Sequence, residues 1–254
     1  MQERSDEEQI LLLVYEIRRD HPTMGLRDMY YKLSPEGIGR DKFELLCKRE
    51  GLSVEHKPNY RRTTNSSGVI RFDNLLEGLE VTHVNQVWQS DITYYELAGK
   101  FCYITFIIDA FSRVITGYHV SKRLKTVHTT LPALNKAISL RSSQNMSVKG
   151  LIFHSDGGGQ YYDKNFLRLT AKYKLKNSMC EYPWENGKAE RVNGVIKNNY
   201  LRHRDITSFE QLVREVDRSV QLYNHEKPHI MLDRKTPIQF EKNCIFAPEH
   251  TSLS

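Results

Sequence analysis

The sequence predicts an α/β protein in which helices cover the faces of a mixed β-sheet and a small helical region precedes that sheet. Three strand-like segments form a meander, and helices then alternate with two shorter strand-like segments. The chain has 254 residues, which fits one core domain with a smaller appendage. The expected division is a helical, helix-turn-helix-like region (1–52), a basic linker (53–82), the sheet-bearing core (83–225) and a C-terminal extension (226–254).

The first 50 residues have the pattern of three short helices. Ser5 and Glu8 fit a capping box, so we expect the first helix to begin there and to end near Pro22. A second helix is expected over 26–33 and a third over 41–50, with a glycine-containing turn between them. Two helices with such a short connection are typical of a DNA-reading motif and equally of any small helical subdomain.

A polar stretch follows, within the predicted linker. It contains Pro58 and a Ser-Ser-Gly break, and its basic residues include Arg61 and Arg62. Such a segment would lie along a phosphate backbone or would simply join two domains.

The core is predicted from alternating patterns. The expected strands are 87–96, 101–110, 114–120, 151–154 and 177–180, and the expected helices are 130–140, 164–174, 186–201 and 208–223. The second strand is almost wholly apolar or β-branched, as in a central strand buried on both faces. Gly99 lies between the first two strands and predicts a tight antiparallel hairpin.

Charge and composition narrow the class of protein. The net charge is +6, with −2 over residues 1–50 and +6 over residues 161–204. A basic excess of this kind indicates either polyanion binding or a solvated surface. No apolar run approaches the roughly 20 residues that a membrane span needs, so we expect a cytoplasmic protein without membrane contact. The four cysteines form no CxxC pair, which argues against a zinc site or a disulfide framework.

Three acidic residues and a lysine are the candidates for chemistry. Asp91 lies inside the first strand, where an unpaired charge is costly, and Asp156 ends a strand just before three glycines. Glu190, Asn193 and Lys197 recur at i, i+3 and i+7, so they share one face of the predicted helix 186–201. Taken singly, each aspartate also fits a structural role, Glu190 also fits a solvated face, and Glu181 and Glu185 are rival carboxylates.

Carboxylates around divalent cations suit phosphodiester chemistry. Mg²⁺ and Mn²⁺ prefer oxygen ligands, and two such ions about 4 Å apart stabilise the attacking and leaving oxygens of an in-line displacement. Three clustered carboxylates repel one another, which raises their proton affinities until a cation binds. The basic balance of the chain indicates a nucleic acid as the phosphodiester.

Five ordered segments resemble a known family: HPTMGLRDMYYKL, WQSDITYYELAGKFCYITFIIDAFSRVITGYHV, HSDGGGQY, ENGKAERVNGVIKNNYL and YNHEKPHIMLDRKTPIQF. They resemble the DDE transposases with a retroviral-integrase-type core, specifically the second-frame (OrfB) product of the insertion-sequence-three family. The resemblance implies a ribonuclease-H-like, mixed five-stranded sheet. It also implies that Asp91, Asp156 and Glu190 are the catalytic residues and the ligands of Mg²⁺ or Mn²⁺, with two ions. The implied reaction is metal-dependent cleavage at insertion-sequence ends, followed by strand transfer into target DNA.

The resemblance also implies partners. We expect DNA contacts at Lys197, Asn193, Arg191, Lys188, Arg61 and Arg62. Because the chain shows no heptad run, we expect it to need a first-frame (OrfA) helix-turn-helix partner, and to form a homo-oligomer on DNA. The expected location is the bacterial cytoplasm, at the nucleoid when bound to DNA. The alternatives are a catalytically inactive DNA-binding regulator derived from a transposase and a nuclease that cleaves without joining.

One departure and several neighbouring residues bear on the site. Glu190 follows Asp156 by 34 positions, slightly fewer than is usual in the family, so Glu185 stays a rival for the third acid. Asp109 is expected to be structural or to support the metal ligands from behind, and His154 to be packed or to touch substrate. Trp88 and Trp184 each fit either base stacking or packing in the core or a loop.

Overall fold

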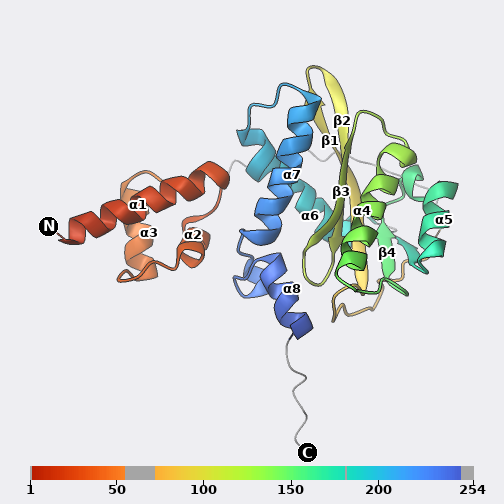
Figure 1. The fold of residues 1–254 in the computed structure, drawn as a ribbon, viewed down its shortest axis with the longest axis horizontal. Helices are drawn as coiled ribbons and strands as arrows, with labels where there is room; N and C mark the ends of the chain where they lie inside the picture. The colour runs from red at the N-terminus through yellow and green to blue at the C-terminus, as the bar shows by residue number, and fades with distance from the viewer. Residues whose placement is uncertain (1, 55–71, 181, 247–254) are drawn as a thin grey trace, which may run out of the picture.

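The computed structural model describes residues 2–54, 72–180 and 182–246. A five-stranded sheet lies between two layers of helices (Figure 1). The strands are β1 (Val87–Leu97), β2 (Lys100–Asp109), β3 (Ile115–Ser121), β4 (Ile152–Ser155) and β5 (Lys176–Met179). Helices α4 (Thr130–Ser143) and α5 (Lys164–Lys172) cover one face, and α6 (Gly187–Val195) and α7 (Phe209–His225) cover the other. The predicted mixed sheet is confirmed.

The spatial order of the strands is β3-β2-β1-β4-β5. The first three strands pair antiparallel as the predicted meander, whereas β1–β4 and β4–β5 pair in parallel. Ala98 and Gly99 turn the first hairpin with φ values of 48° and 73°, the left-handed pair that a two-residue turn between twisted strands requires. β1 is therefore the central strand, with neighbours on both sides.

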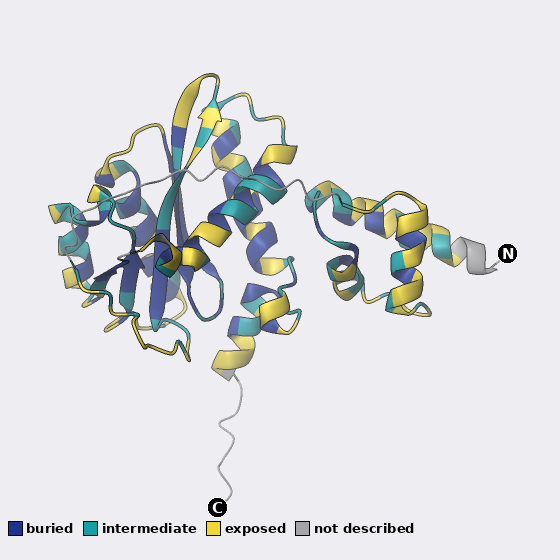
Figure 2. Ribbon diagram, turned by 180° about the vertical axis from the view of Figure 1, so that it is seen from behind, coloured by how far each residue is buried: buried dark blue, intermediate teal, exposed yellow. Residues whose placement is uncertain are grey.

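Two apolar cores fill the space on either side of the sheet, and Figure 2 shows the strands buried between helices with exposed outer surfaces. Phe106 and Ile104 of β2 pack against α6 and α7, whereas Trp88 and Ile107 pack against α4. This division follows from the two-residue period of a strand, which sends alternate side chains to opposite faces. Trp88 is fully buried, as expected of a packing residue.

The N-terminal region contains α1 (Gln2–Asp20), α2 (Leu26–Leu33) and α3 (Arg40–Arg49), which share a small apolar core. The second and third helices match their predicted ranges closely. The predicted N-cap at Ser5 is wrong, because α1 already begins at Gln2 and Ser5 lies within it. Gly51 follows α3 with φ 69°, a left-handed conformation that glycine adopts readily after a helix.

Polar contacts join this region to the core. Lys32 pairs with Glu226 at 2.9 Å, Asp20 with Arg218 at 2.5 Å, and Asp28 with Arg234. A buried His21 lies 3.1 Å from the hydroxyl of Tyr200 through its Nδ1 atom. The helical region is thus held against α7 and the segment that follows it.

Part of the predicted linker belongs to the core. Residues 55–71, with Arg61 and Arg62, lie outside the described residues. Beyond them, the amide of Leu75 donates to Ser178 Oγ at 2.9 Å, and Asn74 Nδ2 donates to Glu185 Oε1 at 2.9 Å. Predicting all of 53–82 as linker was wrong for this part, because composition does not reveal which polar residues pair across the fold.

The predicted helix that carries Glu190 needs correction. The helix expected over 186–201 is α-helical only to Val195 and continues as a π-helical segment, Ile196–Tyr200, and a 3₁₀ turn, Leu201–His203. The predicted extension contains α8 (Pro237–Phe246), whose buried Glu241 pairs with Arg141 of α4 at 2.5 Å. α8 is therefore attached to the core by a buried ion pair. None of the described helices has the length and apolar character that crossing a bilayer demands.

Candidate active site

Two of the three predicted acids lie side by side because of the sheet register. In the parallel pair β1–β4, Ser90 is opposite Ser155. Asp91 and Asp156 are the next residues on these adjacent strands, which lie about 4.8 Å apart in any sheet. They come from segments 65 positions apart in the sequence and meet at the centre of the sheet.

Asp91 carries the most perturbed carboxyl of the three. Burial, then the negative charge of Asp156 and that of Glu190, raise its pKa to about 7. Two hydrogen bonds oppose this shift: the amide of Ile92 donates to Oδ1 at 2.8 Å, and Asn193 Nδ2 donates to Oδ2 at 2.6 Å. A divalent cation bound by these carboxylates would relieve the repulsion between their like charges in this half-buried site.

Asp156 is shaped by the glycine loop after β4. Burial raises its pKa, and the amide of Gly158, which donates to Asp156 Oδ1 at 3.1 Å, opposes that rise. A Cβ atom at Gly158 would lie 3.0 Å from that same oxygen and 3.0 Å from Gln160 Oε1. A side chain at 158 would therefore crowd the Asp156 carboxylate and the Gln160 amide, which would have to shift slightly.

The third acid, Glu190, projects from α6 and is exposed. Its charge contributes to the raised pKa of Asp91, so the predicted helix face is turned toward β1. Within 2–54, 72–180 and 182–246, however, no three His, Cys, Asp or Glu side chains are close enough together to form a metal site. The acids supply the hard oxygen donors that Mg²⁺ prefers, with Asp91 and Asp156 adjacent and Glu190 standing further out.

Asn193 and Lys197 lie on the same face as Glu190, as the i, i+3, i+7 spacing predicts. Asn193 contacts Asp91, and Lys197 Nζ donates to Thr93 Oγ1 at 3.3 Å. The same ammonium lies 4.7 Å from the ring centre of Tyr94, and burial lowers its pKa. The helix thus places an amide and a cation along β1, from Asp91 to Tyr94.

Glu185, the rival third acid, is engaged elsewhere. Its Oε2 accepts from the amide of Tyr182 at 3.0 Å in a capping box, and its Oε1 accepts from Asn74 at 2.9 Å. The negative charge of Glu190, by contrast, contributes to the raised pKa of Asp91. The local geometry therefore favours Glu190 as the partner of the two aspartates.

Comparison with known proteins agrees with this geometry. Two models of the integrase core domain match the chain, over residues 81–182 and 171–237. The chain is 28% identical over 231 residues to an uncharacterized 31 kDa protein of insertion element IS600 from Shigella sonnei, covering 88% of this chain and 83% of that protein. It is 26% identical over 228 residues to the transposase for insertion sequence element IS629 from Shigella sonnei, covering 88% and 75%.

The fold has relatives among solved structures as well. The catalytic core domain of HTLV-2 integrase in complex with magnesium matches with a TM-score of 0.50 and 23% identity, covering 63% of this chain and 97% of that chain. This chain belongs to the DDE transposases with an integrase-type catalytic core. The transposase is accordingly a polynucleotidyl transferase, and its sheet is the ribonuclease-H-like sheet that the resemblance implied.

Two predicted DNA contacts of the transposase, Lys188 and Arg191, have basic neighbours. Burial, followed by the charge of Arg113, lowers the pKa of Lys188, and the charge of Arg191 lowers the pKa of Arg113 and of Lys227. We call these four residues the basic cluster. Lys197, on the same helical segment, instead contacts Thr93 and the ring of Tyr94 on β1.

Asp109 and His154 of the transposase both lie in the core, away from solvent. Asp109 is fully buried and accepts from the amides of Asn85 at 2.7 Å and of Ser112 at 2.9 Å. His154 Nδ1 lies 2.9 Å from Ser178 Oγ, and burial lowers the pKa of the imidazole to about 4.

Sequence reasoning missed Asn186 of the transposase. This buried residue donates from Nδ2 to the carbonyl of Ser90 at 2.9 Å, so it ties the start of α6 to the residue before Asp91. The only signal was a polar residue at a predicted helix start, which is too common to distinguish a buried anchor from an exposed cap.

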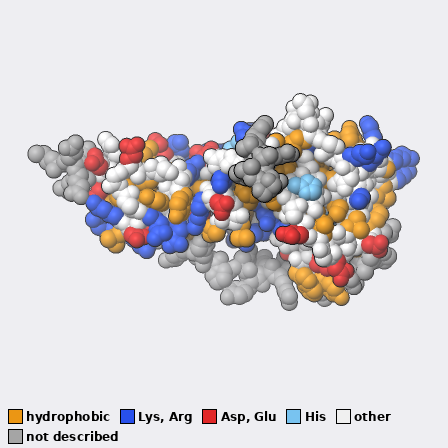
Figure 3. All heavy atoms as spheres, turned by 90° about the horizontal axis from the view of Figure 1, so that it is seen from below, with side chains coloured by type: hydrophobic (Ala, Val, Ile, Leu, Met, Phe, Trp, Pro, Cys, Tyr) orange, Lys and Arg blue, Asp and Glu red, His pale blue; other side chains and the backbone are white. Residues whose placement is uncertain are grey.

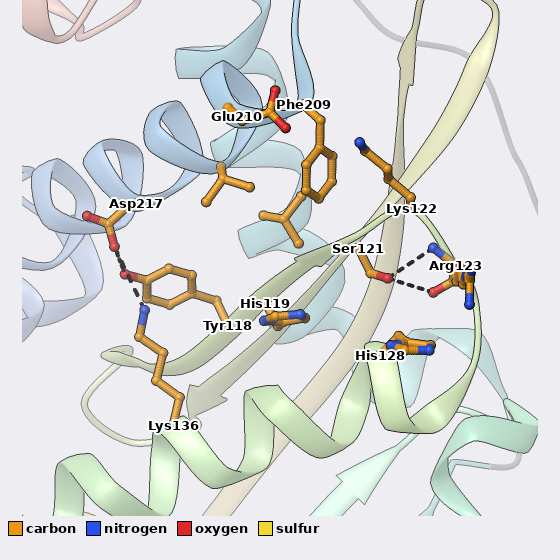
Figure 4. A pocket seen from close by; sticks show the side chains of 12 residues that line it. Tyr118, His119, Ser121, Lys122, Arg123, His128, Lys136, Phe209, Glu210 and Asp217 are labelled. Atoms are coloured by element: carbon orange, nitrogen blue, oxygen red, sulfur yellow. Dashed lines mark hydrogen bonds and ion pairs between the residues drawn. The ribbon is translucent and has the colours of Figure 1, made fainter.

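A hollow of about 560 Å³ lies elsewhere in the transposase, between β3, α4 and α7 (Figure 4). Tyr118 donates from its hydroxyl to Asp217, and Lys136 lies 3.8 Å from the same carboxylate. None of the three acids lines this hollow. The hollow is therefore not formed by the candidate acids.

Proposed function

We propose that Asp91, Asp156 and Glu190 hold two divalent cations, Mg²⁺ or Mn²⁺, for cleavage and strand transfer at insertion-sequence ends. The adjacency of Asp91 and Asp156 on neighbouring parallel strands carries this proposal. When bound, the ions stabilise the attacking and leaving oxygens of an in-line displacement. Glu190, from the facing helix, completes the set by moving toward the aspartates. The HTLV-2 integrase catalytic core domain was solved in complex with magnesium, which is consistent with this choice of metal.

The remaining residues of this face orient the groups that react. Asn193 holds the Asp91 carboxylate through its amide, which favours one rotamer and the ionised form. Lys197 presents its ammonium beside β1, where it binds a phosphate oxygen next to the scissile bond. A strand end with a free 3′-hydroxyl then attacks the target phosphodiester directly, without a covalent enzyme intermediate.

The DNA would cross α6. The proposed contacts are Lys197 and Asn193 beside the acids, and Lys188 and Arg191 within the basic cluster. Arg61 and Arg62 are proposed contacts outside the described residues. Lys and Arg side chains also gather over the N-terminal helical region in the view from below (Figure 3), so that region is a further contact surface. Phosphate contacts of this kind position DNA without reading its sequence.

The proposed partners follow from the reaction. An element has two ends and each chain has one set of acids, so we propose a homo-oligomer on DNA. A first-frame (OrfA) helix-turn-helix partner would recognise the element ends. The site of action would be the bacterial cytoplasm, at the nucleoid when DNA is bound.

Strand joining on labelled element ends with Mg²⁺ tests the proposal. We expect joined products from the wild-type chain with its partner, and their loss in Asp91→Asn, Asp156→Asn and Glu190→Gln. Asp205→Asn, which changes an exposed carboxylate after the 3₁₀ turn, is the matched control and should keep activity. Cleavage without joining would indicate a nuclease, and binding without cleavage in every condition would indicate a regulator.

A further inference from the structure

Two aromatic side chains next to the acids form an exposed parallel stack. The rings of Tyr182 and Trp184 have centroids 4.6 Å apart and planes within 4° of each other. Trp184 is 72% exposed and Tyr182 is 45% exposed. Large aromatic residues normally bury most of their surface, so an outward-facing pair leaves a flat π surface open to solvent.

The turn that carries the stack is held by several polar contacts. Residues Pro183–Asn186 form a 3₁₀ turn in which Tyr182 and Glu185 make a capping box. Glu185 also accepts from Asn74, and its carbonyl accepts from Gln89 Nε2 at 3.3 Å. These bonds reach two separate parts of the core, so the rings are presented by an anchored turn.

The position of the stack connects it to the catalytic face. Asn186 follows Trp184 by two residues and donates to the carbonyl of Ser90, which precedes Asp91. Glu190 lies in the first turn of α6, the helix that follows. The amide of Cys180, two residues before Tyr182, donates to the carbonyl of Ser155, which precedes Asp156, at 3.0 Å. The segment that carries the aromatic pair is therefore bonded, before and after the rings, to the residues that precede Asp156 and Asp91.

We propose that the Tyr182–Trp184 pair is a stacking site for an unpaired nucleobase of the DNA strand whose phosphate lies at the acids. This inference rests on the proposed function, because it needs DNA on this face. A nucleobase suits the site, since every base offers a flat π face and the surrounding segment, 161–204, is basic. Stacking of this kind is insensitive to sequence and would hold a frayed strand end open beside the reacting phosphate.

The chain contains two tryptophans, and their burial makes the test direct. Trp88 is fully buried and Trp184 is exposed, so iodide quenches chiefly Trp184 in the wild-type protein. DNA with an unpaired 3′ overhang and blunt DNA of equal length are added in EDTA, which prevents turnover. We expect the overhang DNA to quench Trp184 emission and to protect it from iodide more than blunt DNA does.

Affinity is measured in parallel by fluorescence anisotropy of labelled DNA. Trp184→Ala should weaken binding of overhang DNA by about 5- to 100-fold, with a much smaller effect on blunt DNA. Trp184→Phe should retain most of the affinity, because it keeps a stacking face. Phe101→Ala, at a 52% exposed ring of the β1–β2 hairpin, is the matched control and should bind like the wild type.

The outcomes separate this inference from the proposed function. If DNA binds but Trp184 emission and the Trp184→Ala affinity are unchanged, the stacking site is wrong and the proposed function stands. If neither DNA binds, both fail. If, without DNA, iodide quenches Trp184 less as the protein concentration rises, a second copy of the chain covers the rings. That result would also overturn the inference.

Discussion

Asn193 donates its side-chain amide to Asp91 Oδ2 at 2.6 Å, which joins α6 to the central strand at the candidate site. The bond holds the carboxylate in one orientation and opposes the rise in its pKa that burial causes. Because Asn193 Oδ1 is buried without a hydrogen-bond partner among the described residues, only the donor end of this amide is used. Asn193 is thus a positioning residue for Asp91.

Replacing Asn193 should impair catalysis more than DNA binding. Asn193→Ala releases the Asp91 carboxylate, so we expect the strand-joining rate to fall by about tenfold or more. We expect the free energy of unfolding to fall by about 1 kcal/mol, because one hydrogen bond is lost. Single-turnover joining and anisotropy on the same DNA measure the two effects. Asn198→Ala, on the same helical segment, is the control, and an equal loss in both variants would remove the positioning role.

Glu190 and Glu185 should respond oppositely to neutralisation. Glu190→Gln should abolish joining while leaving the thermal midpoint nearly unchanged, because Glu190 is exposed. Glu185→Gln should keep joining and lower the midpoint by a few degrees, because the capping box and the bond to Asn74 weaken. Activity retained in Glu190→Gln but lost in Glu185→Gln would reverse the assignment.

Lys197 should contribute one phosphate contact. Lys197→Ala should weaken DNA binding and reduce the slope of log K against log salt by about 1. Lys172→Ala is the matched control, since Lys172 also lies over a tyrosine ring, at 5.4 Å from that of Tyr173, but on α5. Equal slopes for Lys197→Ala and the wild type would show that Lys197 touches no phosphate.

The buried pair between α4 and α8 should matter for stability. Glu241→Leu leaves the fully buried Arg141 guanidinium without its bidentate partner, so we expect a loss of about 3–5 kcal/mol in unfolding free energy. The double variant Arg141→Met with Glu241→Leu should recover only part of that loss, because it leaves the buried Asp109 carboxylate, 3.7 Å from Arg141 in the wild type, without this cation. Arg27→Met, which breaks an exposed pair with Glu44, should cost at most about 1 kcal/mol. Urea denaturation of the four proteins compares them, and similar costs for both single variants would contradict the buried-pair interpretation.

His229 should make the transposase less stable in acid. Burial, followed by the charges of Lys227, Arg113 and Arg191, lowers the pKa of this imidazole to about 3. The folded pKa is below the ordinary value of about 6.5, so the unfolded chain takes up the proton first as pH falls. Stability should therefore decline between about pH 6.5 and pH 3, by up to about 1.4 kcal/mol per unit for this proton.

The variant His229→Gln isolates that contribution. Its unfolding free energy should fall less steeply with acid than that of the wild type across the same window. Denaturant melts at several pH values measure the difference, with His83→Gln, at an exposed position, as the control. Parallel curves for the wild type and His229→Gln would rule out a neutral buried imidazole.

Much of the architecture could be predicted because its signals are local. The apolar run of β2, the glycine at the hairpin and the strand-to-glycine transition at Asp156 each reflect a short-range steric or solvation rule. The i, i+3, i+7 spacing of Glu190, Asn193 and Lys197 likewise predicted their shared face. The order of these motifs predicted the family before any coordinate was known.

The amino-acid sequence indicates which side chains are available and where strands and helices form. That Asp91 meets Asp156 follows only from the fold, since the β1–β4 register pairs residues far apart in the chain. The bond between Glu185 and Asn74 and the attachment of α8 to the core likewise appear only in the folded chain. The physical reason is that local patterns report only neighbouring residues, whereas register, burial and ion pairing depend on contacts between distant segments.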